Sequence, residues 1–427
     1  CNHLFRAGCR RTLIAKKFHI KKKEVMKILL VNTVCGQGST GRICIGIADM
    51  LKANGHEAYI AYGLGNSTYP GSINISEGRF GYLTHNVFSR LLDSEGLHSR
   101  LATKRLLKYI GCIKPDIVHI HTMHGHYLNY KLLFEFLKKA ELPVVMTLHD
   151  CWTFTGHCAH FIMRGCEKWK TGCDKCNFLD EYPQSWFVDK SKRNYQLKKS
   201  LFTSLGNKLT IVPVSYWLEG LVRQSFLKNK KIQTIHNGID LSVFKPTANS
   251  NIRKKYGIEN KKVIIGVALP WSSYKGYPDF LKLRELLTRD YAIIMVGLSN
   301  EQMAKIPNGI IGITRTDSPT ELAEFYTIAD VLVNTTYCDN YPTINLESMA
   351  CGTPVITYRT GGSPESIDYR TGAIVEQGDI QDLIRKIRDI CEVPNNYRTA
   401  CIDKAKRQFD KGKCFANYLN IYSQSLN

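Results

Sequence analysis

The alternation of short apolar runs with longer helical patterns is the feature that most limits what this chain can fold into. Apolar runs of strand length lie at residues 27–32, 57–63, 116–122, 143–150, 209–215 and 231–240, and then at 261–268, 291–297, 309–313, 329–335 and 355–358. Most are separated by stretches long enough for a helix and its turns. Buried parallel strands joined by crossover helices produce this pattern. The sequence therefore predicts an α/β protein built on parallel sheets.

The strand runs divide into two sets, which indicates two domains. A single hydrophobic core stops growing at about 250–300 residues, and this chain has 427. The polar stretch 245–260 separates the two sets and is the expected connector. Ligands bind at the carboxyl ends of the strands in doubly wound sheets. We therefore expect two doubly wound domains that face each other across a ligand-binding cleft.

The segment 339–365, DNYPTINLESMACGTPVITYRTGGSPE, carries the clearest chemical pattern. It places two carboxylates, Asp339 and Glu347, eight positions apart, and Glu347 is expected to open a short helix that ends at Gly352 and Pro354. Free backbone amides at a helix N-terminus bind phosphate groups, and carboxylates bind sugar hydroxyls. The pattern therefore predicts a site for a sugar carried on a diphosphate.

This segment resembles the nucleotide-sugar site of the family 4 retaining glycosyltransferases, whose pattern is E-x7-E followed by A-x-G-x-P and GG-x-P-E. Asp339 stands where the family usually has its first Glu. The D-x-YPT-x-NLE variant looks closest to a subgroup found in bacterial exopolysaccharide and lipopolysaccharide gene sets. The resemblance covers nearly all of residues 26–427. It implies the GT-B fold and transfer of a sugar from a nucleoside diphosphate sugar to a glycan or lipid-linked glycan acceptor, with retention.

The resemblance also implies roles for residues of the second domain. Lys275, in a K-G pair after the first strand of that domain, would bind the diphosphate. Glu347 would hold the nucleotide ribose and Asp339 the hydroxyls of the donor sugar. The family often has a second cation a few residues before the position of Lys275, but here that neighbourhood reads VALPW. The second cation is therefore either missing or supplied from elsewhere, with Arg315 and Arg359 as the candidates. Three further donor-binding residues belong to the same segment: Thr343, Ile344 and Asn345.

The first domain supplies a glycine loop, GSTGRI, directly after its first strand. Its amides, from Gly38 onward, can approach a phosphate or the transferred sugar, and Arg42 adds positive charge. Asn237, in HNGID, matches the NG-(V/I)-D turn of the family; a tight turn between the domains is the alternative. Glu365 is either a cleft residue or a charge at a helix N-terminus.

Histidines stand at the ends of two strands of the first domain. His149, in TLHD, matches the position where related enzymes hold a histidine against the donor sugar. His119 and His121 share one face of their strand, and His121 lies closer to its carboxyl end. Because ligands bind at this edge of a doubly wound sheet, we expect His149 to be catalytic and His121 to lie on the acceptor side.

Five of the 15 cysteines fall within residues 151–176. Cys173 and Cys176 have the spacing of a metal knuckle, and Cys158 and Cys166 complete a tetrahedral set of thiolates. A structural zinc site is the sharper hypothesis, and free thiols or disulfides are the alternatives. No DxD motif follows a strand, so we expect no cofactor for catalysis.

The net charge of +21 suits a partner that carries negative charge. Residues 1–25 hold eight basic residues against Glu24, a net charge of +7, which leaves +14 on the rest. The basic residues are dispersed and no nucleic-acid motif is present, so an anionic membrane surface is the expected partner rather than nucleic acid. No apolar run reaches the ~18 residues of a membrane span, and no signal peptide is evident, so we expect a cytoplasmic or peripheral membrane protein.

The expected domain organisation follows from these patterns and the resemblance. Residues 1–25 form a basic extension expected to be disordered, and 26–235 form an acceptor-side domain with a Cys-rich insert at 151–176. Residues 236–410 form the nucleotide-sugar domain, and 411–427 a helix that packs back on the first domain. Two other functions fit the same fold: a UDP-sugar epimerase and a non-catalytic protein that binds sugar nucleotides.

Overall fold

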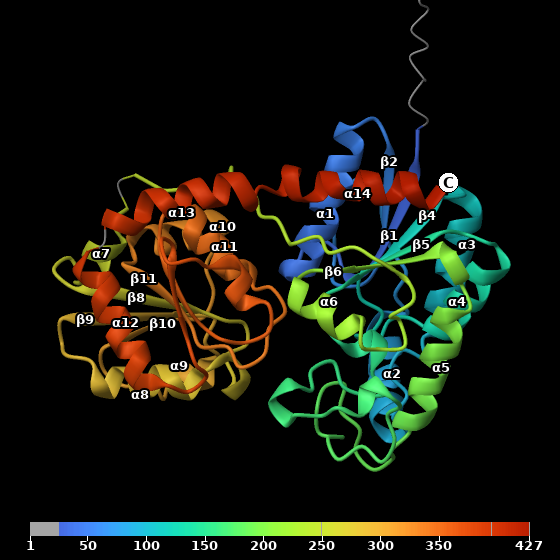
Figure 1. The fold of residues 1–427 in the computed structure, drawn as a ribbon, viewed down its shortest axis with the longest axis horizontal. Coiled ribbons are helices and arrows are strands. Elements are labelled where there is room, and N and C mark those ends of the chain that lie inside the picture. Colours follow the sequence, from blue (N-terminus) through green and yellow to red (C-terminus); the bar gives the residue numbers. More distant parts are fainter. Residues whose placement is uncertain (1–24, 249, 394, 427) are drawn as a thin grey trace, which may run out of the picture.

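The structure is a computed structural model that describes residues 25–248, 250–393 and 395–426. The expected basic extension, apart from Val25, lies outside the described residues. Two α/β domains lie side by side, the first in blue to green and the second in yellow to red (Figure 1). Each is built on one parallel sheet with helices packed on it, as the alternating pattern predicts.

The first domain has a seven-stranded sheet in the order β3-β2-β1-β4-β5-β6-β7. Every pair of neighbouring strands is parallel. The strands are β1 (Lys27–Val34), β2 (Glu57–Leu64), β3 (Ser72–Asn74), β4 (Ile117–Ile120), β5 (Val144–Leu148), β6 (Leu209–Pro213) and β7 (Lys231–Ile232). The helices are α1 (Gly38–Ala53), α2 (Gly78–Leu92), α3 (Arg100–Ile113), α4 (Tyr130–Lys139), α5 (Ser191–Thr203) and α6 (Tyr216–Val222).

The second domain has a six-stranded parallel sheet in the order β10-β9-β8-β11-β12-β13. Its strands are β8 (Lys262–Val267), β9 (Tyr291–Val296), β10 (Ile310–Ile313), β11 (Val331–Asn334), β12 (Val355–Tyr358) and β13 (Gly372–Val375). Its helices are α7 (Ile252–Lys255), α8 (Tyr277–Leu286), α9 (Asn300–Met303), α10 (Pro319–Ile328), α11 (Thr343–Ala350), α12 (Ile380–Glu392) and α13 (Asn395–Gln408).

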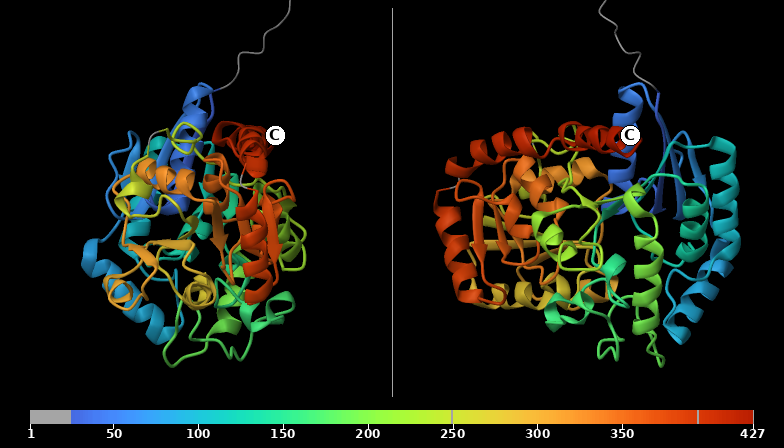
Figure 2. Two further views of the ribbon diagram at one scale, coloured as in Figure 1. Left: turned by 90° about the vertical axis from the view of Figure 1, so that its left-hand side faces the viewer. Right: turned by 45° about the vertical axis from the view of Figure 1, so that its right-hand side comes forward.

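The last helix, α14 (Lys411–Leu426), returns to the first domain and packs on α1, β4 and β5. Figures 1 and 2 show it in red beside the blue helix α1. Its Tyr422 hydroxyl lies 2.7 Å from His119 Nδ1, and the hydroxyl of Thr147 lies 2.8 Å from His119 Nε2. His119 is therefore a core histidine whose two ring nitrogens both have partners.

Two local expectations were wrong. Glu347 does not open a helix, because α11 begins one turn earlier at Thr343, with Pro342 as the preceding N-cap residue. The run 231–240 forms a regular strand only at Lys231–Ile232, although the main-chain N–H groups of Gln233 and Ile235 still donate to oxygens of β6. The stretch 245–260, the expected connector, contains α7, which packs on α10.

Candidate active site

A cleft of about 790 Å³ lies between the two domains. Its walls include the segments that follow β1, β4, β5 and β6 of the first sheet and β8, β9, β10 and β11 of the second. The carboxyl edges of both sheets therefore face one cavity, which is where parallel α/β sheets bind ligands.

Lys275 ends a short 3-10 turn, Ser273–Lys275, on the second-domain wall of the cleft. Its Nζ lies 2.7 Å from Asp339 Oδ2, on the loop that follows β11. Burial alone would lower the pKa of Lys275, but the charge of Asp339 and the hydrogen bond to it together outweigh burial and raise the pKa, so the ammonium stays charged. Gly276 next to it has φ +72°, and a Cβ there would lie 2.0 Å from the Thr335 hydroxyl oxygen. The K-G pair thus reflects a close approach that only glycine permits.

The N-terminus of α11 also opens on the cleft, where Thr343 and Ile344 line the wall. First-turn amides have no partner within their own helix and carry the positive end of its dipole. Asn345 is fully buried and lies outside the cleft lining. Its Oδ1 accepts a 2.9 Å hydrogen bond from Asn334 Nδ2. Asn345 therefore anchors α11 to β11 rather than facing the cavity.

Glu347 lies one turn into α11, and its side chain is 2% exposed. Arg42 Nη2, from α1 of the first domain, approaches its carboxylate to 3.3 Å, and the Tyr326 hydroxyl donates to it at 3.2 Å. Burial raises the pKa of Glu347, and the Arg42 charge opposes that shift. Arg42 and Gly38 line the cleft, so the first-domain glycine loop meets the second-domain helix there.

His149 follows β5 and lines the cleft, whereas His121 stands behind it outside the lining. His121 Nδ1 lies 3.0 Å from His149 Nε2, and the two rings stack. Burial lowers the pKa of His149 to about 4 and that of His121 well below its ordinary value. Both imidazoles are therefore neutral near pH 7. Asn340 of the second domain donates to the main-chain oxygen of His149 and joins the two walls.

Two family models match successive parts of the chain, one for each domain. Residues 40–243 match the family described as "Glycosyltransferase Family 4", and residues 248–408 match "Glycosyl transferases group 1". The chain belongs to the family 4 glycosyltransferases.

Relatives of this glycosyltransferase are consistent with this family assignment. It is 25% identical over 379 residues to the putative colanic acid biosynthesis glycosyl transferase WcaC of Escherichia coli K12, covering 84% of this chain and 90% of that protein. It is 27% identical over 232 residues to N-acetyl-alpha-D-glucosaminyl L-malate synthase of Bacillus anthracis, covering 51% of this chain but only 60% of that relative.

Solved structures share the fold. Sucrose-phosphate synthase from Thermosynechococcus elongatus superposes with a TM-score of 0.70 at 15% identity, covering 93% of this chain and 98% of that chain. Anabaena Alr3699/HepE in complex with UDP-glucose superposes with a TM-score of 0.65 at 14% identity, covering 93% and 100%. At this identity the likeness shows the GT-B fold alone.

Four cleft residues of the glycosyltransferase escaped the sequence reasoning: His124, Asp150, His160 and Tyr182. His124 Nε2 lies 2.7 Å from Asp150 Oδ2, and His124 Nδ1 lies 3.0 Å from the Tyr182 hydroxyl. Although burial opposes both shifts, the pair raises the pKa of His124 and holds the pKa of Asp150 well below its usual range. Asp150 and His124 follow strand ends, a signal that could have found them; the other two lie in the irregular segment after β5.

That segment, residues 149–190, reaches across the cleft. Glu181 accepts hydrogen bonds from the hydroxyl of Tyr274, the residue before Lys275. Arg164 Nε donates to the same carboxylate at 2.7 Å. The segment 149–190, which contains the Cys-rich insert, thereby contacts the turn that carries the candidate phosphate lysine.

The remaining residues that the sequence predicted for the donor site do not all line the cleft. Arg315 lines the cleft, whereas Arg359 forms an exposed ion pair with Glu376. Asn237 lines the cleft, and its Nδ2 donates to the main-chain oxygen of Tyr341 at 3.3 Å.

Glu365 caps a helix of the opposite domain. Its carboxylate accepts the main-chain N–H groups of Tyr216 and Trp217, at 2.9 and 2.7 Å, at the start of α6. His236 Nε2 lies 2.9 Å from the same carboxylate. The carboxylate therefore satisfies free amides of the first domain and stabilises the crossing.

Proposed function

We propose that this glycosyltransferase moves a sugar from a nucleoside diphosphate sugar to a glycan or lipid-linked glycan acceptor, with retained anomeric configuration, in cell-surface polysaccharide synthesis. The observation that carries the proposal is the Lys275–Asp339 pair beside the N-terminus of α11 in the cleft. The colanic acid role in the name of WcaC and the UDP-glucose bound to the Anabaena protein support the substrate class.

The donor diphosphate would replace Asp339 as the partner of Lys275. The ammonium of Lys275 and the amides of Thr343 and Ile344 would then face the negative charge that develops as the diphosphate leaves. Arg315, on the same wall, is the candidate second cation. These groups supply the positive charge, so we propose that catalysis needs no divalent cation.

Asp339, released from Lys275, would accept hydrogen bonds from hydroxyls of the donor sugar. Glu347 would hold the ribose, with Arg42 fixing its carboxylate across the cleft. Neutral His149 offers a ring N–H or a lone pair to the sugar without adding charge.

Retention is proposed to occur by departure and attack on the same face. Three cleft carboxylates already have a cationic or potentially cationic partner: Asp150 has His124, Asp339 has Lys275 and Glu347 has Arg42. Neutralised in this way, they suit binding better than nucleophilic attack on the anomeric carbon. The acceptor hydroxyl would instead be oriented by the departing diphosphate.

An exposed apolar face on α2 suits a lipid-linked acceptor. Its large side chains are between 38% and 79% exposed: Phe80, Leu83, Val87, Phe88 and Leu92. The start of α3 packs beside it, since Ala102 N donates to Glu77 Oε1 at 2.8 Å. That end of α3 adds exposed basic side chains: Arg100, Lys104 and Arg105.

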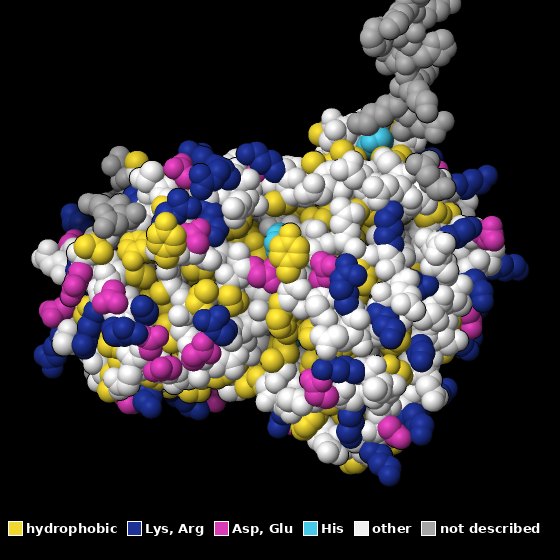
Figure 3. All heavy atoms as spheres, viewed as in Figure 1, with side chains coloured by type: hydrophobic (Ala, Val, Ile, Leu, Met, Phe, Trp, Pro, Cys, Tyr) yellow, Lys and Arg dark blue, Asp and Glu magenta, His cyan; other side chains and the backbone are white. Residues whose placement is uncertain are grey.

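We propose that this α2 face docks on an anionic membrane. Apolar side chains beside basic ones are the composition of interfacial helices. Among the described residues, no helix has the length and apolar character to span a bilayer. Figure 3 shows Lys and Arg side chains spread over both domains, consistent with a general attraction to negative charge. The use of a nucleotide sugar would place the reaction on the cytoplasmic side.

A donor panel tests the proposed function. The purified chain would be incubated with UDP-, GDP- and dTDP-sugars, with and without lipid extract as acceptor, and the products separated. Acceptor-dependent release of nucleoside diphosphate supports the proposal. An altered sugar still attached to its nucleotide would indicate an epimerase, and binding without any product would indicate a non-catalytic protein.

A further inference from the structure

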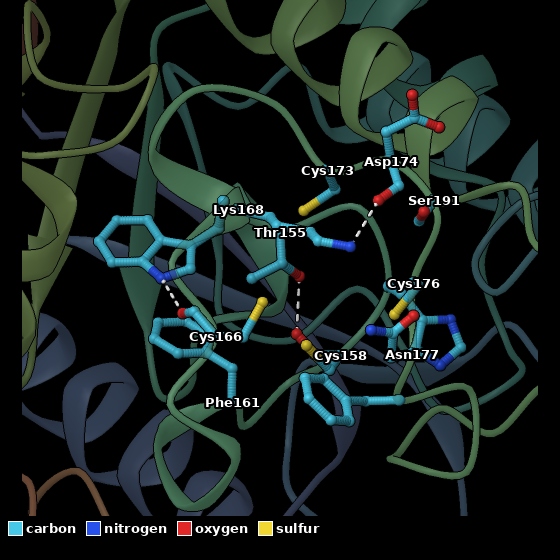
Figure 4. A pocket seen from close by; sticks show the side chains of 13 residues that line it. Thr155, Cys158, Phe161, Cys166, Lys168, Cys173, Asp174, Cys176, Asn177 and Ser191 are labelled. Atoms are coloured by element: carbon cyan, nitrogen blue, oxygen red, sulfur yellow. Dashed lines mark hydrogen bonds between the residues drawn. The ribbon is translucent and has the colours of Figure 1, made fainter.

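Four thiols of the insert line one small cavity. They belong to Cys158, Cys166, Cys173 and Cys176, and the cavity measures about 20 Å³. Figure 4 shows their sulfur atoms around the same space. A water-sized body needs about 10–15 Å³, so the cavity has room for one atom or ion.

We propose that these four cysteines bind one Zn²⁺ as a structural site. Cys173 and Cys176 have the two-residue spacing of a zinc knuckle, and all four lie on irregular backbone, where side chains can turn toward a common centre. Four thiolates close the coordination shell, which leaves no position for water or substrate. The ion would therefore order the insert without taking part in sugar transfer.

A hydrogen bond to one of the sulfurs supports the site. The main-chain N–H of Gly156 donates to Cys173 Sγ at 3.1 Å. A Cβ at Gly156 would lie 2.2 Å from the Ser191 main-chain oxygen and 2.6 Å from Cys173 Cβ, so only glycine lets this amide reach the sulfur. An amide N–H aimed at sulfur stabilises a thiolate more than a neutral thiol.

A buried lysine beside the cavity also supports the proposed zinc site. Lys198 is 1% exposed, and its Nζ donates to the main-chain oxygens of Trp152 and Thr155, the latter in the cavity wall. None of the ion pairs formed within the described ranges includes it. Its other close neighbour is the Trp152 ring, whose centroid lies 3.3 Å from Nζ. A buried ammonium whose direct partners are all neutral is costly, because no counter-charge touches it. Zn²⁺ with four thiolates carries a net charge of about −2, which would supply that counter-charge.

The cavity must contract around the ion. Zn–S bonds of about 2.3 Å place the sulfurs about 3.8 Å apart in a tetrahedron. In the described part of the chain, one three-residue group of possible metal ligands already has all its ligand atoms within 4.8 Å of one another. That group is not part of the cysteine set; it consists of His85, Glu95 and His126. Rotation about the Cα–Cβ bonds of the four cysteines would bring their sulfurs inward.

The histidine group is a weaker candidate because hydrogen bonds already engage two of its members, and the third, His126, has its Nδ1 2.6 Å from Glu95 Oε2. Glu95 accepts the main-chain N–H groups of Gly125 and His126 and the hydroxyl of Ser89. His85 Nε2 accepts the main-chain N–H of Gly96 at 3.2 Å. This network holds the loop after β4 in place.

The proposed zinc would act on the active site through the insert. His160 stands two residues after Cys158 and lines the cleft, where its Nδ1 is buried without a hydrogen-bond partner. Glu181, five residues after Cys176, binds Tyr274 beside Lys275. Ordering the four thiols would therefore hold His160 and Glu181 in position.

Metal analysis of the full chain, purified without added zinc, tests the proposal. We expect about one zinc per chain, and near zero in Cys173→Ser and Cys176→Ser. Cys176→His should keep most of the metal, since histidine can replace one thiolate. Cys112→Ser is the matched control, because Cys112 is exposed on α3, far along the chain from the cavity.

If a cysteine variant fails to fold, cobalt substitution and thiol titration of the unaltered chain still test the proposal. Co²⁺ should produce the intense sulfur-to-metal absorption and visible bands of a tetrahedral thiolate site. A chelator should make four more thiols reactive as zinc leaves. Near-zero zinc with four freely reactive thiols would overturn the proposal, and so would disulfides among the four detected by mass spectrometry.

Discussion

Replacing Lys275 with alanine removes the cation proposed to meet the donor diphosphate. Lys275 and Asp339 form a 2.7 Å pair whose side chains are 36% and 23% exposed. A pair this accessible contributes about 0–1 kcal/mol to stability, so Tm should move by only a few degrees. In the transition state the same ammonium would face the negative charge that develops on the leaving diphosphate. Losing it should cost about 2–4 kcal/mol, or about 30- to 1,000-fold in kcat/KM.

The assay is acceptor-dependent release of nucleoside diphosphate, with calorimetric binding of the free diphosphate measured in parallel. Lys275→Arg keeps the charge and should recover part of the activity. Lys282→Ala removes an exposed lysine of α8 and is the matched control. If Lys275→Ala retained kcat/KM within about twofold, a change below ~0.5 kcal/mol, the phosphate role would be refuted.

Three further outcomes are expected. Glu347→Gln should weaken nucleotide affinity and turnover together, whereas Asp339→Asn should lower turnover more than affinity, measured by calorimetry and steady-state kinetics. Asp150→Asn should lower Tm most between about pH 4 and 6.5, where the ion pair with His124 is intact. The deficit should shrink above that range as His124 loses its proton through its raised pKa. Phe80→Asp should reduce co-sedimentation with anionic vesicles several-fold without changing transfer to a water-soluble acceptor.

Each outcome has a clear contrary result. A larger loss of diphosphate affinity for Asp339→Asn than for Glu347→Gln would reverse the two assignments. A Tm deficit of Asp150→Asn that does not vary with pH would mean that the carboxylate stabilises the fold by packing rather than by charge. If the Phe80→Asp variant bound both neutral and anionic vesicles to the same extent as the unaltered chain does, α2 would be excluded as the docking face.

The sequence by itself determined the features that depend on neighbouring residues. Buried strands such as β1 and β5 are short apolar runs, and their order along the chain predicts parallel sheets because crossover helices separate them. The K-G pair at Lys275 and the eight-residue spacing of Asp339 and Glu347 could be recognised in the sequence, because each is formed by residues close together in the chain. Lys275 and Asp339 lie on segments that follow β8 and β11, at the edge where a doubly wound sheet places its ligands.

Only the tertiary structure decided which distant residues complete the site. Arg42 and Glu347 are 305 positions apart in the chain, and His119 and Tyr422 are 303 apart. No local pattern encodes such a pair, because it forms when two sheets and a returning helix pack together. His121 illustrates the same limit: alternation along β4 predicts its face, but only the packing of His149 in front of it shows that it does not line the cleft.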